Sequence, residues 1–563
     1  MKNKLINTRQ VRQRNILFYA LVFIGSFSYA QIGIGNTNPQ ATLDITATNQ
    51  ATPSNNEGLL IPRVDAFPAT NPTAAQQGML IYLTTTVGVN TKGFYHWDQP
   101  TTSWIRFSSI EKLNDLTDGK SDVDGTNDGS SVFLGIGAGQ GDDSSDNKNV
   151  GVGYGSLENT TTGSNNAALG YLTLTNNTGS NNAAFGFQAM RVNTSGQGNS
   201  AFGKRALEKN TTGNHNTAVG ADALGENVGA KNTAVGNGAM FTNTTGEANV
   251  AMGDQALYKN TTGTKNLSIG NLSLFKNTGS LNVALGNETL YENTTGIENV
   301  AIGNLALYDN QTGARNTAIG TEALTNNTAA LADGSSTAVG YHALYQNVDG
   351  VSNTGVGYEA LNDNVSSNNN TAFGHGALKE NISGGNTAIG SLAGQLIAND
   401  DNASSANVLI GQLAAQELDG SNNVIIGQQA GRFTVGNENV FIGRQAGRDN
   451  EGSSNVFIGN RSGFNGAWDL FSNTLLIQNE NSATPLIHGD FDTNKVGIAK
   501  IATTHALEVN GTTEATQYKL SALNTAPASA TDTGTEGEIR VTATHIYVCI
   551  ATDTWVRSAL ATW

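Results

Sequence analysis

Residues 216–232 read Asn216-Thr-Ala-Val-Gly220-Ala-Asp-Ala-Leu224-Gly-Glu-Asn-Val-Gly229-Ala-Lys-Asn232, and the final Asn begins the same pattern again. The glycine that closes each Asn-x-Ala-(Ile/Val/Phe)-Gly segment recurs in steps of 16 or 17 residues, with two longer steps of 20 and 21. These glycines are Gly153, Gly170, Gly186, Gly203, Gly220, Gly236, Gly253, Gly270, Gly286, Gly303, Gly320, Gly340, Gly357, Gly374, Gly390, Gly411, Gly427, Gly443 and Gly459. A fixed period of this length indicates a repeat architecture.

The repeat predicts an all-β fold. Its apolar segments are three to five residues long and end at Asn-Thr-Thr-Gly turns, which suits short strands rather than helices. We therefore expect a left-handed parallel β-roll, or solenoid, of about 20 coils, and strand spacing makes it a rod of roughly 95 Å. From Gly390 onward an Ala-Leu pair becomes Ala-Gly, which predicts a thinner coil and a solenoid of two subsections.

Both sides of each strand are apolar. Val250 and Met252 point to one side of their strand and Ala251 to the other. One side can face the inside of the coil, while the other needs a partner, and this favours a homotrimer. Because the middle residue becomes large in the last coils, we expect that residue to be buried between subunits. We expect Ile302 to lie in a core column. Those large middle residues are Ile425, Phe441 and Phe457, and the neighbours of Ile302 in its column are Leu285 and Ile319.

An asparagine lies four residues before every closing glycine except Gly340, which Ser336 precedes. Stacked coils bring such amides about 4.8 Å apart, a spacing at which they hydrogen-bond along the stack. Asn also tolerates left-handed backbone angles, so the alternative is that these residues decorate solvated turns. The residues expected to form the ladder are Asn216, Asn232, Asn249, Asn266, Asn282, Asn299 and Asn316.

The Asn-x-Ala-Ile-Gly unit resembles the head repeat of YadA-like trimeric autotransporter adhesins, over residues 133–465. This resemblance implies a trimeric left-handed β-roll. The repeat is longer than the family's, so we expect a larger coil cross-section. The chain shows neither a long coiled-coil stalk nor a C-terminal β-barrel anchor, so the resemblance does not extend to autotransport.

The two ends favour an exported protein. Five Lys and Arg residues, an apolar run over residues 16–24 and Ser28-Tyr29-Ala30 predict a signal peptide. We expect a signal peptide at 1–30, a small β-module at 31–109, an acidic linker at 110–132, the repeat stalk at 133–465 and a β-module or tip at 466–563. The two modules share a similar pattern, as if duplicated. The mature chain is expected to lack a membrane span and to be secreted, extracellular or on the outer-membrane surface.

Further resemblances concern these ends. Gly33-Ile34-Gly35, followed by Leu43-Asp44-Ile45, resembles exported fibre-like proteins of Bacteroidota. Residues 537–563 resemble the tips of phage tail fibres.

Two groups of residues are candidate sites. Asp122, Asp124 and Asp128 lie around Gly125 and predict a Ca²⁺ site, with a solvated linker as the alternative. Trp97, Trp104 and Trp555 are candidates for glycan stacking, with packing inside small β-modules as the alternative. No other cofactor is expected.

Composition and motifs argue against several classes of function. The net charge of −16 argues against nucleic acid as a partner, and the lone Cys549 leaves no intramolecular disulfide. We recognise no catalytic constellation, so the chain is not expected to be an enzyme. We expect a structural and adhesive fibre that binds a surface glycan or protein receptor. The alternatives are a receptor-binding fibre of a phage-derived particle, an ice-binding solenoid and a polysaccharide-degrading enzyme.

Overall fold

The computed structural model describes residues 32–34, 38, 43–45, 59–107, 119–121, 131–142, 147–328, 335–397, 404–464, 466, 468–480 and 482–561. The chain divides into two compact units, Met1–Thr117 and Asp118–Trp563. Within the described ranges the elements are β-strands and one short 3₁₀ helix, η2 (Ala74–Gln76). The predicted signal peptide lies outside these ranges.

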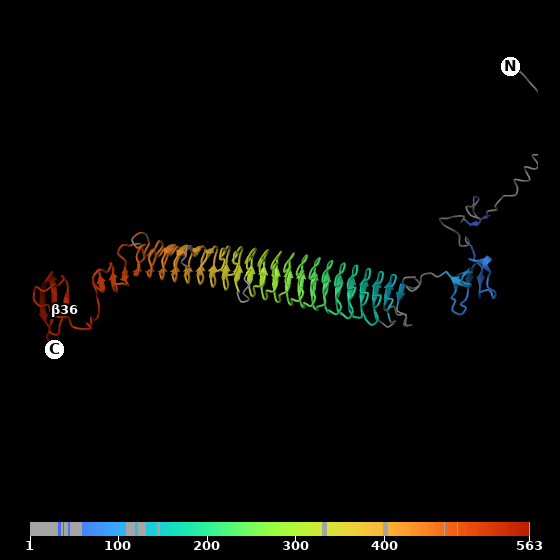
Figure 1. The fold of residues 1–563 in the computed structure, drawn as a ribbon, viewed down its shortest axis with the longest axis horizontal. Helices are drawn as coiled ribbons and strands as arrows, with labels where there is room; N and C mark the ends of the chain where they lie inside the picture. The colour runs from blue at the N-terminus through green and yellow to red at the C-terminus, as the bar shows by residue number, and fades with distance from the viewer. Residues whose placement is uncertain are drawn as a thin grey trace, which may run out of the picture. The chain divides into compact units, whose positions relative to one another are not determined.

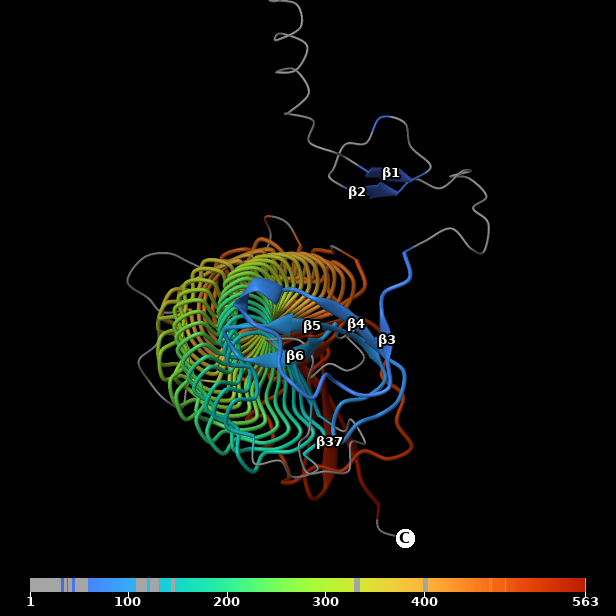
Figure 2. The same cartoon turned by 90° about the vertical axis from the view of Figure 1, so that its right-hand side faces the viewer.

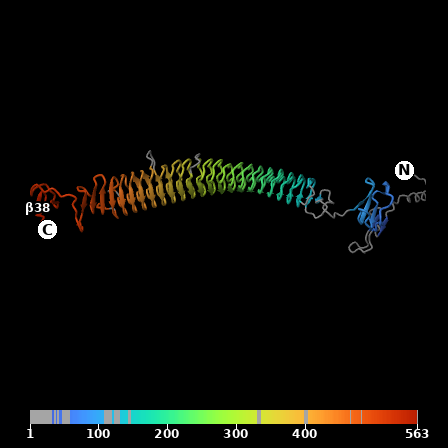
Figure 3. The same cartoon turned by 90° about the horizontal axis from the view of Figure 1, so that it is seen from below.

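The second unit contains a parallel β-solenoid, as predicted, in which each coil adds one short strand to a continuous ladder (Figures 1 and 3). Neighbouring strands pair in strict register, for example Ala234 with Ala251, and the pairing continues across both longer repeats. Its strands are β8 (Val132–Leu134), β9 (Val150–Val152), β10 (Ala167–Leu169), β11 (Ala183–Phe185), β12 (Ser200–Phe202), β13 (Thr217–Val219), β14 (Thr233–Val235), β15 (Val250–Met252), β16 (Leu267–Ile269), β17 (Val283–Leu285), β18 (Val300–Ile302), β19 (Thr317–Ile319), β20 (Thr337–Val339), β21 (Thr354–Val356), β22 (Thr371–Phe373), β24 (Thr387–Ile389), β26 (Val408–Ile410), β28 (Val424–Ile426), β30 (Val440–Ile442), β31 (Val456–Ile458) and β32 (Thr474–Ile477).

The middle residue of each strand points into the coil. In the coil of β15, Ala251, Ala256 and Leu257 are fully buried, whereas Met252 is 43% exposed. Figure 2 shows the coils end-on, stacked one behind another. The expectation that the middle residue faces another subunit is therefore wrong. Ile302, expected in a core column, is 37% exposed and points outward.

The backbone explains which residue fills each coil. Leu257 has φ 55°, and its equivalents in the other coils up to Leu378 share this left-handed conformation. β-branched side chains tolerate such angles poorly. The column accordingly contains only Leu and Met: Leu157, Leu174, Met190, Leu207, Leu224, Met240, Leu257, Leu274, Leu290, Leu307, Leu324, Leu344, Leu361 and Leu378. Hydrogen bonds between coils hold the strained turn, such as that from the Leu257 N–H to the Ser273 carbonyl at 2.9 Å.

The closing glycines are required by close approach between coils. Gly253 has φ 139°, and a Cβ atom added to it would collide with the carbonyl oxygen of Gly270 in the next coil. Any other residue here would force the coils apart. This explains why the glycine column has no exception from Gly153 to Gly459.

The C-terminal coils exchange large and small residues rather than becoming thinner. Phe441 replaces the usual Ala in the strand, and Gly447 replaces the usual Leu. A Cβ atom on Gly447 would lie 2.6 Å from the Phe441 ring, so the ring fills the volume that Leu occupies elsewhere. A second parallel sheet forms in the four consecutive coils of β22, β24, β26 and β28, and consists of β23 (Glu380–Asn381), β25 (Leu396–Ile397), β27 (Glu417–Asp419) and β29 (Phe433–Val435).

The solenoid sheet continues beyond residue 465, where the sequence placed the start of a separate module. After β32 the sheet adds β33 (Ile487–Asp490), β34 (Lys495–Ile498) and β35 (Leu507–Val509). β33 is antiparallel to both β32 and β34, and β35 is parallel to β34. Trp468 is buried in the same core cluster as Phe457. At the other end, β7 (Gly119–Ser121) pairs antiparallel with β8.

Three small sheets complete the described structure. β1 (Ile32–Ile34) pairs with β2 (Leu43–Ile45). In the N-terminal module, β3 (Arg63–Val64), β4 (Leu80–Leu83), β5 (Gly93–Asp98) and β6 (Ser103–Arg106) form one sheet over a core of Ile81, Leu83 and Tyr95. In the C-terminal module, β36 (Ile539–Val541), β37 (His545–Ala551) and β38 (Thr554–Ala559) form an antiparallel sheet.

Candidate functional site

The outward face of the solenoid sheet is apolar along its whole length. Because the strands are in register, the third residue of each strand forms a continuous outward row, half-buried or exposed, and Phe373 is 54% exposed. The row is Leu134, Val152, Leu169, Phe185, Phe202, Val219, Val235, Met252, Ile269, Leu285, Ile302, Ile319, Val339, Val356, Phe373, Ile389, Ile410, Ile426, Ile442 and Ile458. A parallel row of first strand residues, mainly Val and Thr, lies beside it. A contiguous apolar surface this large marks an interaction site.

The asparagine column named from the sequence lies inside the coils. Each of the seven asparagines is buried. The Asn216 side-chain oxygen accepts a hydrogen bond from the Asn232 N–H at 2.9 Å, and the Asn232 side-chain amide donates to the Gly246 carbonyl at 2.8 Å. The left-handed residue is the one before each Asn, such as Lys231 with φ 60°, rather than the Asn itself. This column therefore tethers each coil to the previous coil and to its own next turn.

A second asparagine ladder runs through the turns, and the sequence analysis missed it. The side-chain amide of Asn243 donates to Asn227 Oδ1 at 2.6 Å, and Asn260 donates to Asn243 at 2.8 Å. Asn277 continues the ladder, and all four are fully buried. The signal was the Asn that begins each Asn-Thr-Thr-Gly turn at the same period, which was interpreted only as a turn residue.

Aromatic rings stack between coils on the solenoid surface. Phe241, Tyr258, Phe275, Tyr291 and Tyr308 follow one another with ring centroids 5.1–5.5 Å apart and near-parallel planes. Because the inner rings are covered on both faces by their neighbours, those faces are unavailable to a sugar. The stack stabilises the contact between coils.

Threonine hydroxyls in the turns also serve contacts between coils. Thr244 Oγ1 donates to the Thr261 carbonyl at 2.8 Å, and Thr294 Oγ1 donates to the Gln311 carbonyl at 2.9 Å. These hydroxyls point along the stack and do not form a regular Thr-x-Thr face toward water. The arrangement gives no support to ice binding.

The tryptophans proposed for glycan stacking pack inside the small modules. Trp97 is buried, and Trp104 lies between Trp97 and Phe67, with ring centroids 5.6 and 5.8 Å away. Trp555 is also buried, and its indole N–H donates to the Asp532 carbonyl at 3.0 Å. The structure thus contradicts a platform formed by Trp97, Trp104 and Trp555, because their faces are covered by protein.

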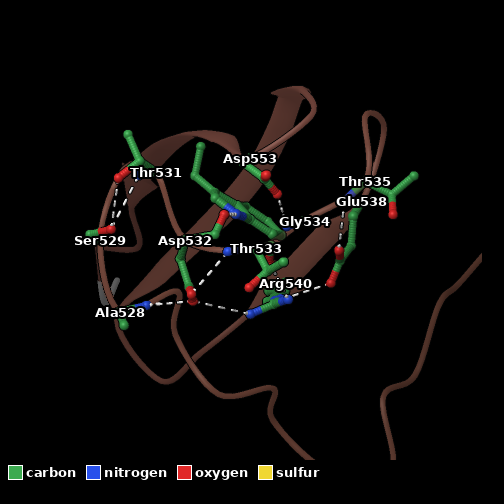
Figure 4. Close-up of polar contacts among 11 residues, drawn as sticks. Ala528, Ser529, Thr531, Asp532, Thr533, Gly534, Thr535, Glu538, Arg540 and Asp553 are labelled. Atoms are coloured by element: carbon green, nitrogen blue, oxygen red, sulfur yellow. Dashed lines mark hydrogen bonds and ion pairs between the residues drawn. The ribbon is translucent and has the colours of Figure 1, made fainter.

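Charged side chains contact the loop that contains Asp532 and Gly534 (Figure 4). The Arg540 guanidinium lies 4.5 Å from the Trp555 ring and donates to Glu538 at 2.7 Å, which lowers the pKa of Glu538. Backbone N–H groups of Ala528 and Thr533 donate to the Asp532 carboxylate and lower its pKa. Every group here has a structural partner, so the cluster stabilises the module.

The predicted Ca²⁺ ligands Asp122, Asp124 and Asp128 lie outside the described residues. Within the described part of the chain, no group of three His, Cys, Asp or Glu side chains gathers at metal-binding distance. No helix in that part has the length and apolar character needed to cross a membrane.

One region of the chain is similar to a known protein family. Residues 31–125 match the family described as "phage tail like trimerisation region". Searches of curated proteins and of solved structures found no match. The match and the solenoid together support a fibre-like trimeric structural protein. The resemblance to YadA-like heads and to Bacteroidota fibre proteins is not confirmed by these comparisons.

Proposed function

We propose that this chain is an exported, homotrimeric structural fibre that mediates attachment to a surface glycan or protein receptor. The observation that carries the proposal is the outward apolar row of the solenoid sheet, in a chain whose residues 31–125 match a trimerisation region. The chain has no catalytic role in this proposal. Its buried asparagines serve contacts between coils.

The apolar row supports association of three solenoids along their length. Burial of apolar surface contributes about 25 cal/mol per Å², so each Ile or Leu removed from water adds up to roughly 1 kcal/mol. The row repeats this contribution in every coil. Three chains in the same register would bring their rows together around one three-fold axis, which forms a closed ring of equivalent contacts.

Substitutions on the outward and inward sides of the sheet distinguish the subunit interface from the core. In the mature chain, residues 31–563, Ile302→Asp combined with Ile319→Asp places charge on the outward row. We expect this variant to fold and to have a lower assembled mass by light scattering. Ala301→Asp places a charge in the sealed core and should cost several kcal/mol of folding stability. Thr262→Asp, in an exposed turn, is the matched control. A monomeric unsubstituted chain at micromolar concentration would overturn the trimer.

Attachment is tested separately. A glycan array probed with the trimer and with the Ile302→Asp/Ile319→Asp variant should show glycan binding that weakens tenfold or more on dissociation, because three linked sites bind with avidity. Binding of neither form to any glycan, followed by failure to bind receptor-bearing cells, would remove the adhesive role and leave the structural one.

A second candidate is a receptor-binding fibre of a phage-derived particle. The match to a phage tail-like region favours it. The predicted signal peptide favours export instead. Its removal would make Gln31 the first residue of the mature chain. Fractionation of native cells distinguishes them: a fibre that sediments with particles and retains Met1 supports the particle, whereas surface material that begins at Gln31 supports the exported fibre.

A further inference from the structure

The C-terminal module has the same plan as the N-terminal module. In both, three antiparallel strands follow one another, β4–β5–β6 and β36–β37–β38. A glycine with positive φ precedes the first of these three strands in each module, Gly78 at 82° and Gly537 at 90°. The Gly78 N–H donates to the Trp97 carbonyl at 2.9 Å, and the Gly537 N–H donates to the Cys549 carbonyl at 2.7 Å. These bonds align Trp97 with Cys549.

The buried sides of the two modules agree with that alignment. Trp97 pairs across the sheet with Trp104, and Cys549 pairs with Trp555. A Pro-Ala pair precedes each glycine by the same number of residues, beginning at Pro68 in one module and at Pro527 in the other. The correspondence between the three antiparallel strands therefore extends through strand order, register, a backbone hydrogen bond and the segment before the first strand.

The outward faces correspond as well. Leu80 and Ile105 are 40% and 39% exposed, and their equivalents Ile539 and Val556 are 60% and 46% exposed. Of six outward positions, the C-terminal module has apolar residues at five and no charged residue at any. The equivalent pairs, N-terminal residue first, are Leu80 and Ile539, Tyr82 and Val541, Phe94 and Ile546, His96 and Val548, Ile105 and Val556, and Phe107 and Ser558.

We infer that β36–β38 is a second trimerisation module, whose outward face contacts the same module in two further copies of this chain. The N-terminal counterpart lies within residues 31–125, which match a trimerisation region. The inference rests on the trimer proposed above and adds a subunit contact after the solenoid in sequence.

The C-terminal module also needs a partner on physical grounds. Among the described residues of β36–β38, the buried apolar side chains are Cys549 and Trp555. A three-stranded sheet with so small a core is marginal alone, because one layer cannot bury both of its faces. A second copy supplies the missing layer with the same apolar residues, whereas a sugar would require outward aromatic rings, and the outward positions here are aliphatic or polar.

The test measures distances between copies at two places in the full mature chain, residues 31–563. A spin label is attached to Thr552→Cys, in the β37–β38 turn, or to Thr262→Cys, in a solenoid turn. The native Cys549 is buried, and the unsubstituted chain controls for its labelling. Double electron–electron resonance should give a single narrow distance distribution at each position, because three symmetric copies have equal separations.

The outcomes separate the two proposals. A narrow distribution at 262 with a broad one at 552 overturns the second trimerisation module and leaves the fibre trimer intact. Loss of the narrow distribution at both positions overturns the trimer itself.

Variants then test the assigned face. Ile539→Asp with Val556→Asp should broaden the distribution at 552 and leave that at 262 unchanged, while Ala543→Asp, in the exposed β36–β37 turn, should change neither. Protection of Cys549 from a thiol reagent, in chains without the label, reports that the module remains folded. A folded Ile539→Asp/Val556→Asp variant with an unchanged distribution at 552 would contradict the face.

Discussion

The exchange between Phe441 and Gly447 shows how single residues set the interior of a coil. Upstream coils place Ala in the strand and Leu at a left-handed turn position, as in Ala251 and Leu257. In the coils of β28, β30 and β31 the strand residue is large and Gly takes the position with positive φ, which removes backbone strain. The composition change was visible in the sequence. Its meaning was not, because a contact between residues six apart cannot be inferred before the turn geometry is known.

This exchange predicts a rescue. Phe441→Ala should cost about 3–5 kcal/mol, because it empties a core site, and Gly447→Leu alone should also destabilise, because the ring already fills that volume. The double variant restores the upstream pattern and should recover part of the loss. Hydrogen exchange of the amides in β28, β30 and β31 measures the effect locally. If the double variant equals the sum of the single variants, the two residues do not share one volume.

The second asparagine ladder predicts an order of destabilisation. Asn260→Ala leaves the Asn243 side-chain oxygen without its donor, which costs about 1–3 kcal/mol. Asn260→Asp should cost more at neutral pH, since a buried carboxylate would face the Asn243 oxygen and the Gly263 carbonyl. Thr262→Ala, in the same turn but exposed, should be neutral. Urea unfolding of the three variants gives the order, and equal stability of Asp and Ala variants would argue against a sealed ladder.

At the scale of the strand, the direction predicted from the sequence for the middle residue is wrong, because that residue points into the coil and not toward another subunit. Val250, Ala251 and Met252 are all apolar, so alternation has no polar face that identifies the outside. The parallel solenoid could be predicted from the period alone. The inward direction of Ala251 could not, because it depends on the backbone conformation of the turns. Burial explains the choice: the small residue fits where the coil is narrow, and the large one extends outward.

The last strands of the solenoid sheet depend on one carboxylate. Glu508, in β35, accepts hydrogen bonds from Lys500 Nζ and from the N–H groups of Thr503, Thr504 and His505. Lys500 first, and then these backbone donors, hold the pKa of Glu508 far below its usual range. A group with a depressed folded-state pKa stabilises the fold above its unfolded pKa, and that contribution is lost as the pH falls through the folded-state value.

The expected pH dependence follows from that sign. Glu508→Gln should lower the stability of β34–β35 by a constant amount from pH 8 to pH 5, and the difference from the unsubstituted chain should shrink only below the ordinary glutamate pKa of about 4.5. Hydrogen exchange in residues 495–509 measures it. Glu514→Gln, an exposed carboxylate nearby in sequence, is the control. A difference that grew on acidification would show that the ionised form is not the stabilising one.

At the scale of the whole molecule, the sequence was most informative where the chain repeats. The period, the glycine column and the first asparagine column could all be predicted, because each coil repeats the constraints of its neighbours. The end of the solenoid could not, since β32–β35 continue the sheet without the Asn-x-Ala-x-Gly pattern. The burial of Trp97 and Trp555 could not be predicted from the sequence either, because an aromatic residue in a short strand can face either side of the sheet.

The stack itself predicts that a whole coil can be removed. Deletion of residues 299–315 joins Glu298 to Asn316 and brings Asn282 next to Asn316, Ala284 next to Ala318, and Leu285 next to Ile319. Each position then meets its own equivalent from the next coil, so the ladders re-form, and the outward row loses one member in every copy without losing register. Because each coil contacts only its neighbours, the chain should fold, associate and lose only one coil's contribution to stability.

Deletion of residues 299–306 is the matched contrast, since it removes the strand and keeps the turn. It places the Leu307 turn directly after Glu298 and interrupts the sheet ladder, the first asparagine ladder and the outward row together. We expect the full-coil deletion to keep a cooperative thermal transition by circular dichroism and an unchanged number of chains by light scattering, and the half-coil deletion to lose both. Equal damage from the two deletions would mean that stability depends on contacts beyond neighbouring coils, which a solenoid does not have.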